Sequence, residues 1–381
     1  MSGRRNGSAM TSTTCLWYDA PASEYINGLP IGTGRLAAMI LGAPEEERLA
    51  LNHEWLWRGV HRNREPQKNA HMLPEVRDLL LSGRFDEGTQ RGDEAFGGPG
   101  GGSGEANRVD SYQPAADLRF SLEHGPVSEY RRELDLDTSR VEVTYVADGC
   151  RFSREYLAHI EHDLLLVRLT AEQPFICKFW LDRIADADCF LRGRAAPDAM
   201  LLDGQFEGGI GFRVEARLLQ TDGTARVHGE GLRIESAREV LLAIDIGTSA
   251  RAEAPAAECA RQRLPTASWA DLLTSSRSAY ERLYGGLTLE VDLPEVSDSA
   301  RAGRTTAAWL AAAREGESAP HLPLLYFNLG RYLLVASTAT ASLPPNLQGK
   351  WNEELDPPWN SDYHHDVNLQ MNYWPAEPGN L

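Results

Sequence analysis

The sequence predicts a mainly β N-terminal domain, followed by a helical linker and further helices. Apolar and polar residues alternate in short runs from Leu118 to about Ile246, with turn residues between runs spaced about 8–12 residues apart, which is typical of a large antiparallel sandwich. Residues 249–320 are rich in Ala, Arg, Glu and Ser and carry helical patterns. The length of 381 residues exceeds one ordinary domain, so we expect at least two.

The first sixty residues are expected to alternate short strands with turns. The turn at Pro30–Arg35 precedes an apolar run at Leu36–Leu41, which is short enough to be a buried strand, and Leu49–Asn52 is the next strand. Gly32 and Gly34 fit this turn because a glycine accepts a positive φ angle without steric cost.

The segment after residue 60 is expected to be helical and then loosely structured. A helix is predicted over Ala70–Leu81, with Leu73, Val76, Leu79 and Leu80 on one face. The run Gly97–Gly104 lacks the GK[ST] ending of a phosphate-binding loop, so we interpret it as a surface connection.

The remaining elements follow from periodicity. Strands are predicted over Val141–Val146, Phe152–Tyr156, Asp163–Thr170, Val227–Ile234 and Glu239–Ile246. Helices are predicted over Ser268–Tyr284, Ser299–Arg314 and Leu324–Thr338. The last helix is apolar on all faces, which indicates burial between other helices.

Composition narrows the function. Lys and Arg number 38 against 55 Asp and Glu, a formal charge of −17, which disfavours nucleic acid as a partner because phosphate backbones are repelled. No run approaches the roughly 20 apolar residues of a membrane span, so we expect no membrane association. The N-terminus has no apolar signal segment, which favours the cytoplasm, or secretion if the gene start is misplaced.

The C-terminal forty residues are the most informative stretch. They combine three tryptophans with two histidines, six asparagines and many prolines. Aromatic faces suit the C–H faces of sugars and neutral amides match hydroxyls, so this composition indicates a carbohydrate site, although the aromatics could equally be core. Adjacent His364 and His365 point opposite ways in an extended segment, so we expect no metal ion there and no cofactor.

Several motifs together resemble glycoside hydrolase family 95, the inverting α-L-fucosidases that cut 1,2-linked fucose. They are Leu29–Gly42, Leu51–Trp57, Tyr112–Leu118, Tyr130–Leu136 and the whole tail from Tyr326 to Leu381. Residues 1–14 are expected from their own sequence to be a disordered tail. The resemblance implies a β super-sandwich at 15–250 and a helical linker at 251–315. It also implies that 316–381 is the start of an incomplete (α/α)6 catalytic barrel.

The resemblance also carries site residues. The family pattern of a His, an Asn and an Asn at alternate positions falls on His364, Asp366 and Asn368. It implies that His364 contacts the sugar and that Asn368, with the residue at 366, holds the attacking water. Asp366 departs from the commoner Asn. Substrate contacts are also expected from four aromatic and amide side chains of the same stretch: Trp351, Gln348, Trp359 and Asn372.

The resemblance implies a hydrolase that removes terminal α-1,2-linked L-fucose from a fucosylated glycan with inversion. Its general acid and the carboxylate that polarises Asn368 fall beyond residue 381, so we expect this chain alone to be inactive. Three alternatives remain: an α-L-galactosidase on the same scaffold, a non-catalytic carbohydrate-binding or structural sandwich, and a disaccharide phosphorylase of related architecture.

Overall fold

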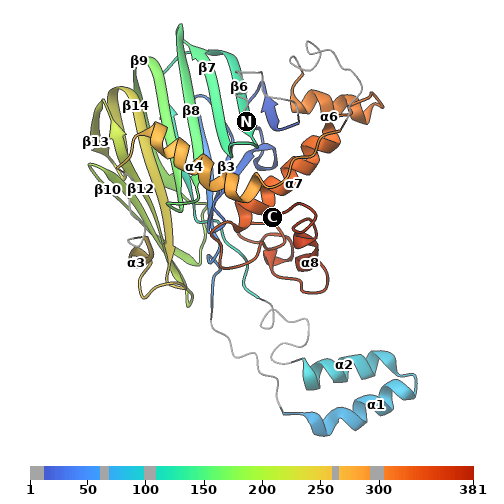
Figure 1. Ribbon diagram of the computed structural model, residues 1–381. Helices are drawn as coiled ribbons and strands as arrows, with labels where there is room; N and C mark the ends of the chain where they lie inside the picture. The colour runs from blue at the N-terminus through green and yellow to red at the C-terminus, as the bar shows by residue number, and fades with distance from the viewer. Residues whose placement is uncertain (1–12, 61–67, 98–108, 260–265, 292–303) are drawn as a thin grey trace.

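The computed structural model describes residues 13–60, 68–97, 109–259, 266–291 and 304–381. The described strands form one antiparallel sheet that curls on itself (Figure 1). They are β1 (Cys15–Tyr18), β2 (Leu29–Gly32), β3 (Leu36–Ile40), β4 (Glu46–His53), β5 (Ala116–Leu122), β6 (Val127–Asp135), β7 (Arg140–Ala147), β8 (Cys150–His159), β9 (Leu164–Asp182), β10 (Cys189–Ala196), β11 (Ala199–Phe206), β12 (Gly211–Thr221), β13 (Thr224–His228) and β14 (Gly231–Thr248).

Two long strands, β9 and β14, carry the sheet from one layer to another. The N-terminal part of β9 pairs with β8 and its C-terminal part pairs with β5. The C-terminal part of β14 pairs with β12, and its beginning pairs with β13. The pairing of the two long strands is irregular between Ile234 and Glu239, and such an irregularity bends a sheet. One layer is therefore β1-β6-β7-β8-β9-β14-β12-β11-β10, and the other contains β2, β3, β4 and β5.

The main core lies between these layers. Val141, Val143 and Tyr145 of β7 are fully buried and belong to the same apolar cluster as Ile31 of β2. Strand β2 contacts β7 and β8 without pairing with either, as expected for elements packed face to face. The predicted alternation in β7 is confirmed, because the residues between the buried ones are only half-buried.

One ion pair is fully enclosed in this core. The Glu47 carboxylate of β4 lies 3.4 Å from the Arg154 guanidinium of β8 and accepts a 2.8 Å hydrogen bond from the Tyr156 hydroxyl. All three side chains are buried, so the pair depends on its partners for solvation.

Helices cover two surfaces of the sheet. The described helices are η1 (Tyr25–Asn27), η2 (Ala70–Met72), α1 (Leu73–Leu81), α2 (Phe85–Phe96), α3 (Pro255–Cys259), α4 (Trp269–Tyr284), α6 (Thr306–Arg314), α7 (Leu322–Thr338), η4 (Pro358–Ser361) and α8 (Asn368–Tyr373). Within the described ranges, none is long and apolar enough to cross a membrane.

Helix α4 packs on the outer face of the layer that contains β8, β9 and β14. Ser268 caps its N-terminus by accepting the N–H of Asp271, which fits the predicted start of the helix. Trp269 and Leu272 form a second apolar cluster with residues of those strands. A polar contact also links α4 to β8, because the Nε2 atom of His159 lies 3.0 Å from the Ser275 hydroxyl.

Helix α7 approaches the β2–β3 turn very closely (Figure 1). A Cβ at Gly32 would overlap the carbonyl oxygen of Ala336, whereas Gly34 has a φ of +104° and its Cβ would lie 2.8 Å from Thr338. The expectation of a positive φ is thus confirmed for Gly34. It is wrong for Gly32, which is needed for the close approach of the helix.

Three other expectations are corrected. The predicted strand Val227–Ile234 is two strands, because a turn at Gly229 separates β13 from β14. The predicted face of the helix at 70–81 buries only Val76, since α1 packs mainly on α2 and lies apart from the sheet (Figure 1). Helix α7 is not buried on all faces, because Tyr326 is 79% exposed. The glycine run falls mostly outside the described residues.

Candidate active site

The segment that follows α7 is fixed to the β sheet through Glu54, which comes directly after β4. The buried Glu54 carboxylate accepts hydrogen bonds from the backbone N–H of Ser342 at 3.0 Å and of Leu343 at 2.8 Å. The Lys350 ammonium lies 3.3 Å from the same carboxylate, and burial lowers the pKa of this lysine. One carboxylate therefore organises both ends of the loop 342–350.

Asparagine side chains extend this attachment. Asn52 of β4 donates to the carbonyl of Asn352 at 2.8 Å and accepts its N–H at 3.1 Å, as a neighbouring strand would. The Asn352 amide donates to the Tyr112 carbonyl at 2.9 Å, and the Tyr112 hydroxyl donates to the Lys350 carbonyl at 3.0 Å. The chain around residue 352 is thus held by polar side chains rather than by a strand ladder.

Aromatic rings complete the contact between the two regions. Trp57 packs against Tyr112 and Tyr363, with ring centroids 5.2 and 5.7 Å apart. The Tyr363 hydroxyl donates to the Pro344 carbonyl at 3.1 Å. These contacts fix the position of Tyr363, which directly precedes His364 in the chain.

The three residues that the family pattern singles out share one turn. The N–H of Leu369 donates to the His364 carbonyl at 2.9 Å, which closes a loop containing Asp366 and Asn368. Asp366 and Asn368 are exposed, and Asn368 begins α8. Val367, between them, has a φ of +131°, which is strained for a β-branched residue, and such strain concentrates at functional sites.

His364 has two neighbours that orient it. Its Nε2 lies 2.6 Å from the Asp362 carboxylate, and the Trp359 ring meets the imidazole edge-on at a centroid distance of 5.7 Å. Trp359 is 75% exposed and begins a run of three left-handed residues that ends at Ser361. An exposed aromatic face beside a positioned imidazole is an arrangement that suits a sugar ring.

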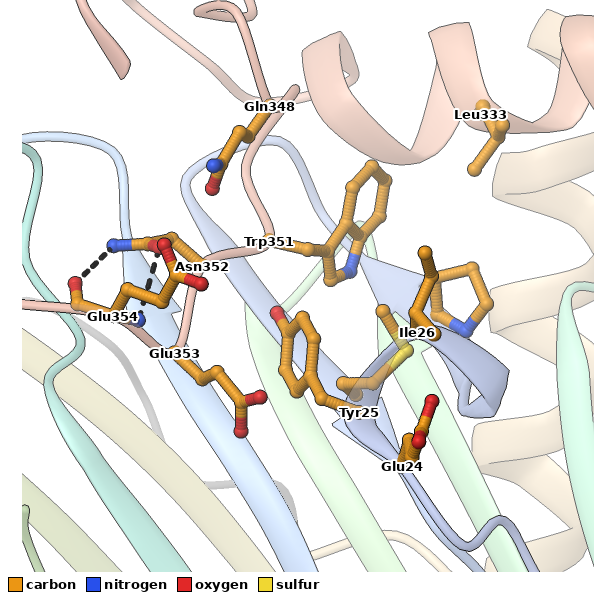
Figure 2. A pocket seen from close by; sticks show the side chains of 11 residues that line it. Glu24, Tyr25, Ile26, Leu333, Gln348, Trp351, Asn352, Glu353 and Glu354 are labelled. Atoms are coloured by element: carbon orange, nitrogen blue, oxygen red, sulfur yellow. Dashed lines mark hydrogen bonds between the residues drawn. The ribbon is translucent and has the colours of Figure 1, made fainter. Parts of the chain in front are cut away.

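The other predicted substrate residues lie elsewhere. Gln348 and Trp351 line a cavity whose walls include no residue of the His364–Leu369 turn (Figure 2). Asn372 donates its amide to the Pro345 carbonyl at 3.1 Å, so in this structure it supports the loop. The predicted site residues therefore lie in three places. His364, Asp366 and Asn368 lie in the turn beside Trp359, Gln348 and Trp351 line the cavity, and Asn372 supports the loop.

Within the described ranges, no group of three or more His, Cys, Asp or Glu side chains is placed to hold a metal ion. Glu353, a carboxylate of the same C-terminal stretch, pairs with Arg48 at 2.7 Å. Asp362, next to His364, is the carboxylate that the fold brings to the predicted sugar-contacting imidazole.

Sequence reasoning missed the residues that hold this region in place. Glu54 and Asn52 were not predicted to contribute, although Glu54 is the one acidic residue in the apolar and aromatic stretch Leu51–Trp57. A buried charge in such a stretch needs a partner, and this was the available signal.

Comparisons with known proteins agree with this arrangement. Residues 16–253 match the family "Glycosyl hydrolase family 65, N-terminal domain", and residues 268–381 match "Glycosyl hydrolase family 95 catalytic domain". The chain is 26% identical to Alpha-L-fucosidase 2 of Arabidopsis thaliana over 99% of its length, covering 48% of that protein. It is 27% identical to "Probable alpha-fucosidase A" of Aspergillus oryzae over 98% of its length, covering 54% of that protein.

A glycosyl hydrolase N-terminal domain is thus followed in this chain by a segment that matches a glycosyl hydrolase catalytic domain. Through residues 16–253, more than half of its length, the chain belongs to the family "Glycosyl hydrolase family 65, N-terminal domain". The chain spans about half the length of the curated relatives it matches.

Proposed function

We propose that the protein takes part in the hydrolysis of terminal α-1,2-linked L-fucose from glycans, with inversion at the anomeric carbon. The observation that carries the proposal is the closed turn that presents His364, Asp366 and Asn368 together beside the exposed ring of Trp359. The α-L-fucosidase relatives supply the choice of sugar.

In this proposal His364 and Asn368 have different roles. His364 donates to or accepts from hydroxyls of the fucosyl ring, and its pairing with Asp362 fixes the orientation of the imidazole. Asn368 orients the attacking water through its amide, but an amide is no base, so it needs a carboxylate partner. Inversion requires an acid and a base about 6.5–9.5 Å apart, on opposite sides of the scissile bond.

We also propose that residues 15–250 form a super-sandwich, 251–315 a linker, and 316–381 the first part of an (α/α)6 barrel. In this proposal the general acid and the carboxylate partner of Asn368 are not supplied by these 381 residues. We therefore expect the 381 residues alone to bind L-fucose without releasing it from a glycoside.

Asp366 supports a second candidate sugar. L-galactose differs from L-fucose only by a hydroxyl at C6, and an exposed carboxylate in the turn is an acceptor for one more hydroxyl. An α-L-galactosidase preference would appear as tighter binding of L-galactose that reverts to L-fucose in Asp366→Asn.

The test measures binding and turnover separately. Saturation-transfer NMR of the purified chain with L-fucose should show binding that His364→Ala weakens about fivefold, since one hydrogen bond to the ligand is lost. His365→Ala is the matched control, because this neighbouring exposed histidine has no assigned role and should bind fucose normally.

Turnover is measured with 2′-fucosyllactose and free fucose as the readout. No release is expected from the chain alone. Release that disappears in Asn368→Ala would show that the missing acid and base lie within these residues, with Asp366 the first to examine. Absence of fucose binding, or equal binding by the His364→Ala and His365→Ala variants, would overturn the proposed site and favour a non-catalytic sandwich.

A further inference from the structure

A second concave site lies between the β sheet and the helical region. The cavity has a volume of about 650 Å³, within the range of ligand pockets in proteins. Its walls come from the N-terminal segment Glu24–Ile26, from β2 and β3, from Leu333 of α7, and from the segment Gln348–Glu354 (Figure 2). The turn that carries Asn368 does not contribute to it.

The aromatic wall of this cavity is rigid. The indole N–H of Trp351 donates to the Ile31 carbonyl at 3.1 Å, which ties the ring to β2. Gly349 has a φ of +72°, and a Cβ there would lie only 3.1 Å from the indole, so the loop backbone is closed tightly over the ring. Together with the ring of Tyr25, Trp351 offers a fixed apolar surface for the C–H face of a sugar.

The Tyr25 hydroxyl is a polar group without a protein partner. Its oxygen is buried, and no group of the described residues forms a hydrogen bond with it. Burial raises the pKa of this phenol, so the hydroxyl remains a neutral donor and acceptor. Figure 2 shows it directed toward the chain segment that carries Trp351 and Asn352. Buried hydroxyls normally find a partner, and a ligand hydroxyl in the cavity would supply one.

The charges at the cavity select the kind of ligand. Three carboxylates line it, those of Glu24, Glu353 and Glu354, and no described cationic side chain does. Arg48, outside the lining, is occupied by Glu353 and Asp117, at 2.7 Å each. Carboxylates accept hydrogen bonds from hydroxyls and repel sulfate, phosphate and uronate groups. The apolar floor of Pro30, Met39 and Leu333 disfavours a bare cation.

We propose that this cavity is an accessory binding pocket for a neutral hexose-containing oligosaccharide, with Tyr25 and Trp351 as its principal contacts. The pocket is separate from the fucose-binding turn. The pocket would hold a part of a glycan that contains no fucose. The choice of a glycan as the ligand rests on the proposed function.

The experiment titrates the full chain with lactose, a neutral disaccharide that contains no fucose, and follows it by saturation-transfer NMR. Saturable binding in the millimolar range is expected, and 3′-sialyllactose, which adds a carboxylate, should bind at least about fivefold more weakly. Tyr25→Phe removes only the hydroxyl and should weaken lactose binding about fivefold. Tyr130→Phe is the matched control, because the Tyr130 hydroxyl donates to the Gly42 carbonyl outside the cavity.

Two further variants separate this proposal from the proposed function. Glu24→Ala, at the cavity wall, should weaken lactose binding and leave fucose binding unchanged, whereas His364→Ala should do the reverse. The pocket is overturned if lactose does not bind saturably, if Tyr25→Phe binds it as well as the parent chain, or if a cationic aminosugar is the only ligand that binds. Lactose binding that depends on Tyr25 would stand even if the fucose experiment failed.

Discussion

The β sheet and the segment 342–381 are held together by different means. In the sheet, backbone hydrogen bonds between strands and a continuous apolar core fix each strand, and many side chains contribute to its stability. The C-terminal segment has no ladder, and a few buried polar side chains, above all Glu54 and Asn52, bond its backbone instead. The position of the C-terminal segment therefore depends on a few individual side chains. Replacing one of them should unfold this segment locally while the sheet stays folded.

The largest effect is expected from Glu54→Ala. The substitution removes the counterion of the buried Lys350 ammonium and frees the backbone N–H groups of Ser342 and Leu343, at a cost of about 3–5 kcal/mol. Hydrogen exchange measured by mass spectrometry should show lost protection in 342–363 and retained protection in the strands.

The matched control for that variant is Glu47→Ala, which strands the buried Arg154 inside the sheet. It should lower protection throughout the strands. If both variants gave the same exchange pattern, the two regions would form one cooperative unit and the comparison would fail.

Gly34→Ala tests the place where the helical region presses on the sheet. The alanine would adopt an unfavourable φ of +104° and its Cβ would overlap α7 near Thr338, so we expect a loss of about 2–4 kcal/mol in urea unfolding. Gly149 also has a positive φ, of +72°, but no atom lies within 4 Å of the position of a Cβ there. Gly149→Ala should therefore lower the free energy of unfolding by only about 1 kcal/mol. Equal losses would show that the approach of α7 adds nothing.

A pH effect is expected where α4 meets the sheet. Burial lowers the pKa of His159 to about 4, with His162 as the smaller cause, and its Nδ1 accepts the His162 N–H at 3.2 Å, a bond that requires neutral imidazole. The unfolded chain takes up this proton first, so stability is complete above about pH 6.5 and is lost as pH falls toward 4, by about 1–3 kcal/mol.

Urea unfolding at about pH 7 and about pH 4.5 measures this loss. His159→Asn removes the titrating group and should flatten that part of the pH dependence. A dependence that is unchanged in His159→Asn would assign the loss to other groups.

The smallest change in stability is expected from Trp359→Ala. The ring is mostly exposed, so unfolding should change by no more than about 0.5 kcal/mol, while fucose binding weakens about fivefold through the lost aromatic face. Trp374→Ala, at another exposed tryptophan, should affect neither. Reduced stability without reduced binding would make Trp359 a structural residue.

Local patterns predicted the elements well where one periodicity covers one element. The alternation in β7 and the helical pattern that begins at Ser268 are visible within a few residues, and both are confirmed. The predicted strand Val227–Ile234 failed because its alternation hides a tight turn at Gly229.

The site residues were predicted through resemblance rather than periodicity, and their roles stay predictions. The structure places His364, Asp366 and Asn368 in the turn at 364–369. Its support could not be predicted, because Glu54 and Leu343 are 289 residues apart and no local pattern pairs them. The Tyr25 hydroxyl was equally hidden, since its isolation depends on three separate segments meeting around it.

The two long strands also constrain how the protein is made. During synthesis, β5 emerges well before the part of β9 that pairs with it, so its hydrogen-bonding edge stays open in the interval. The layer that runs from β1 to β10 is not complete until β14 has left the ribosome, because β14 joins β9 to β12. The N-terminal region should therefore acquire native structure late and all at once, and it is a poor choice for division into separately expressed halves.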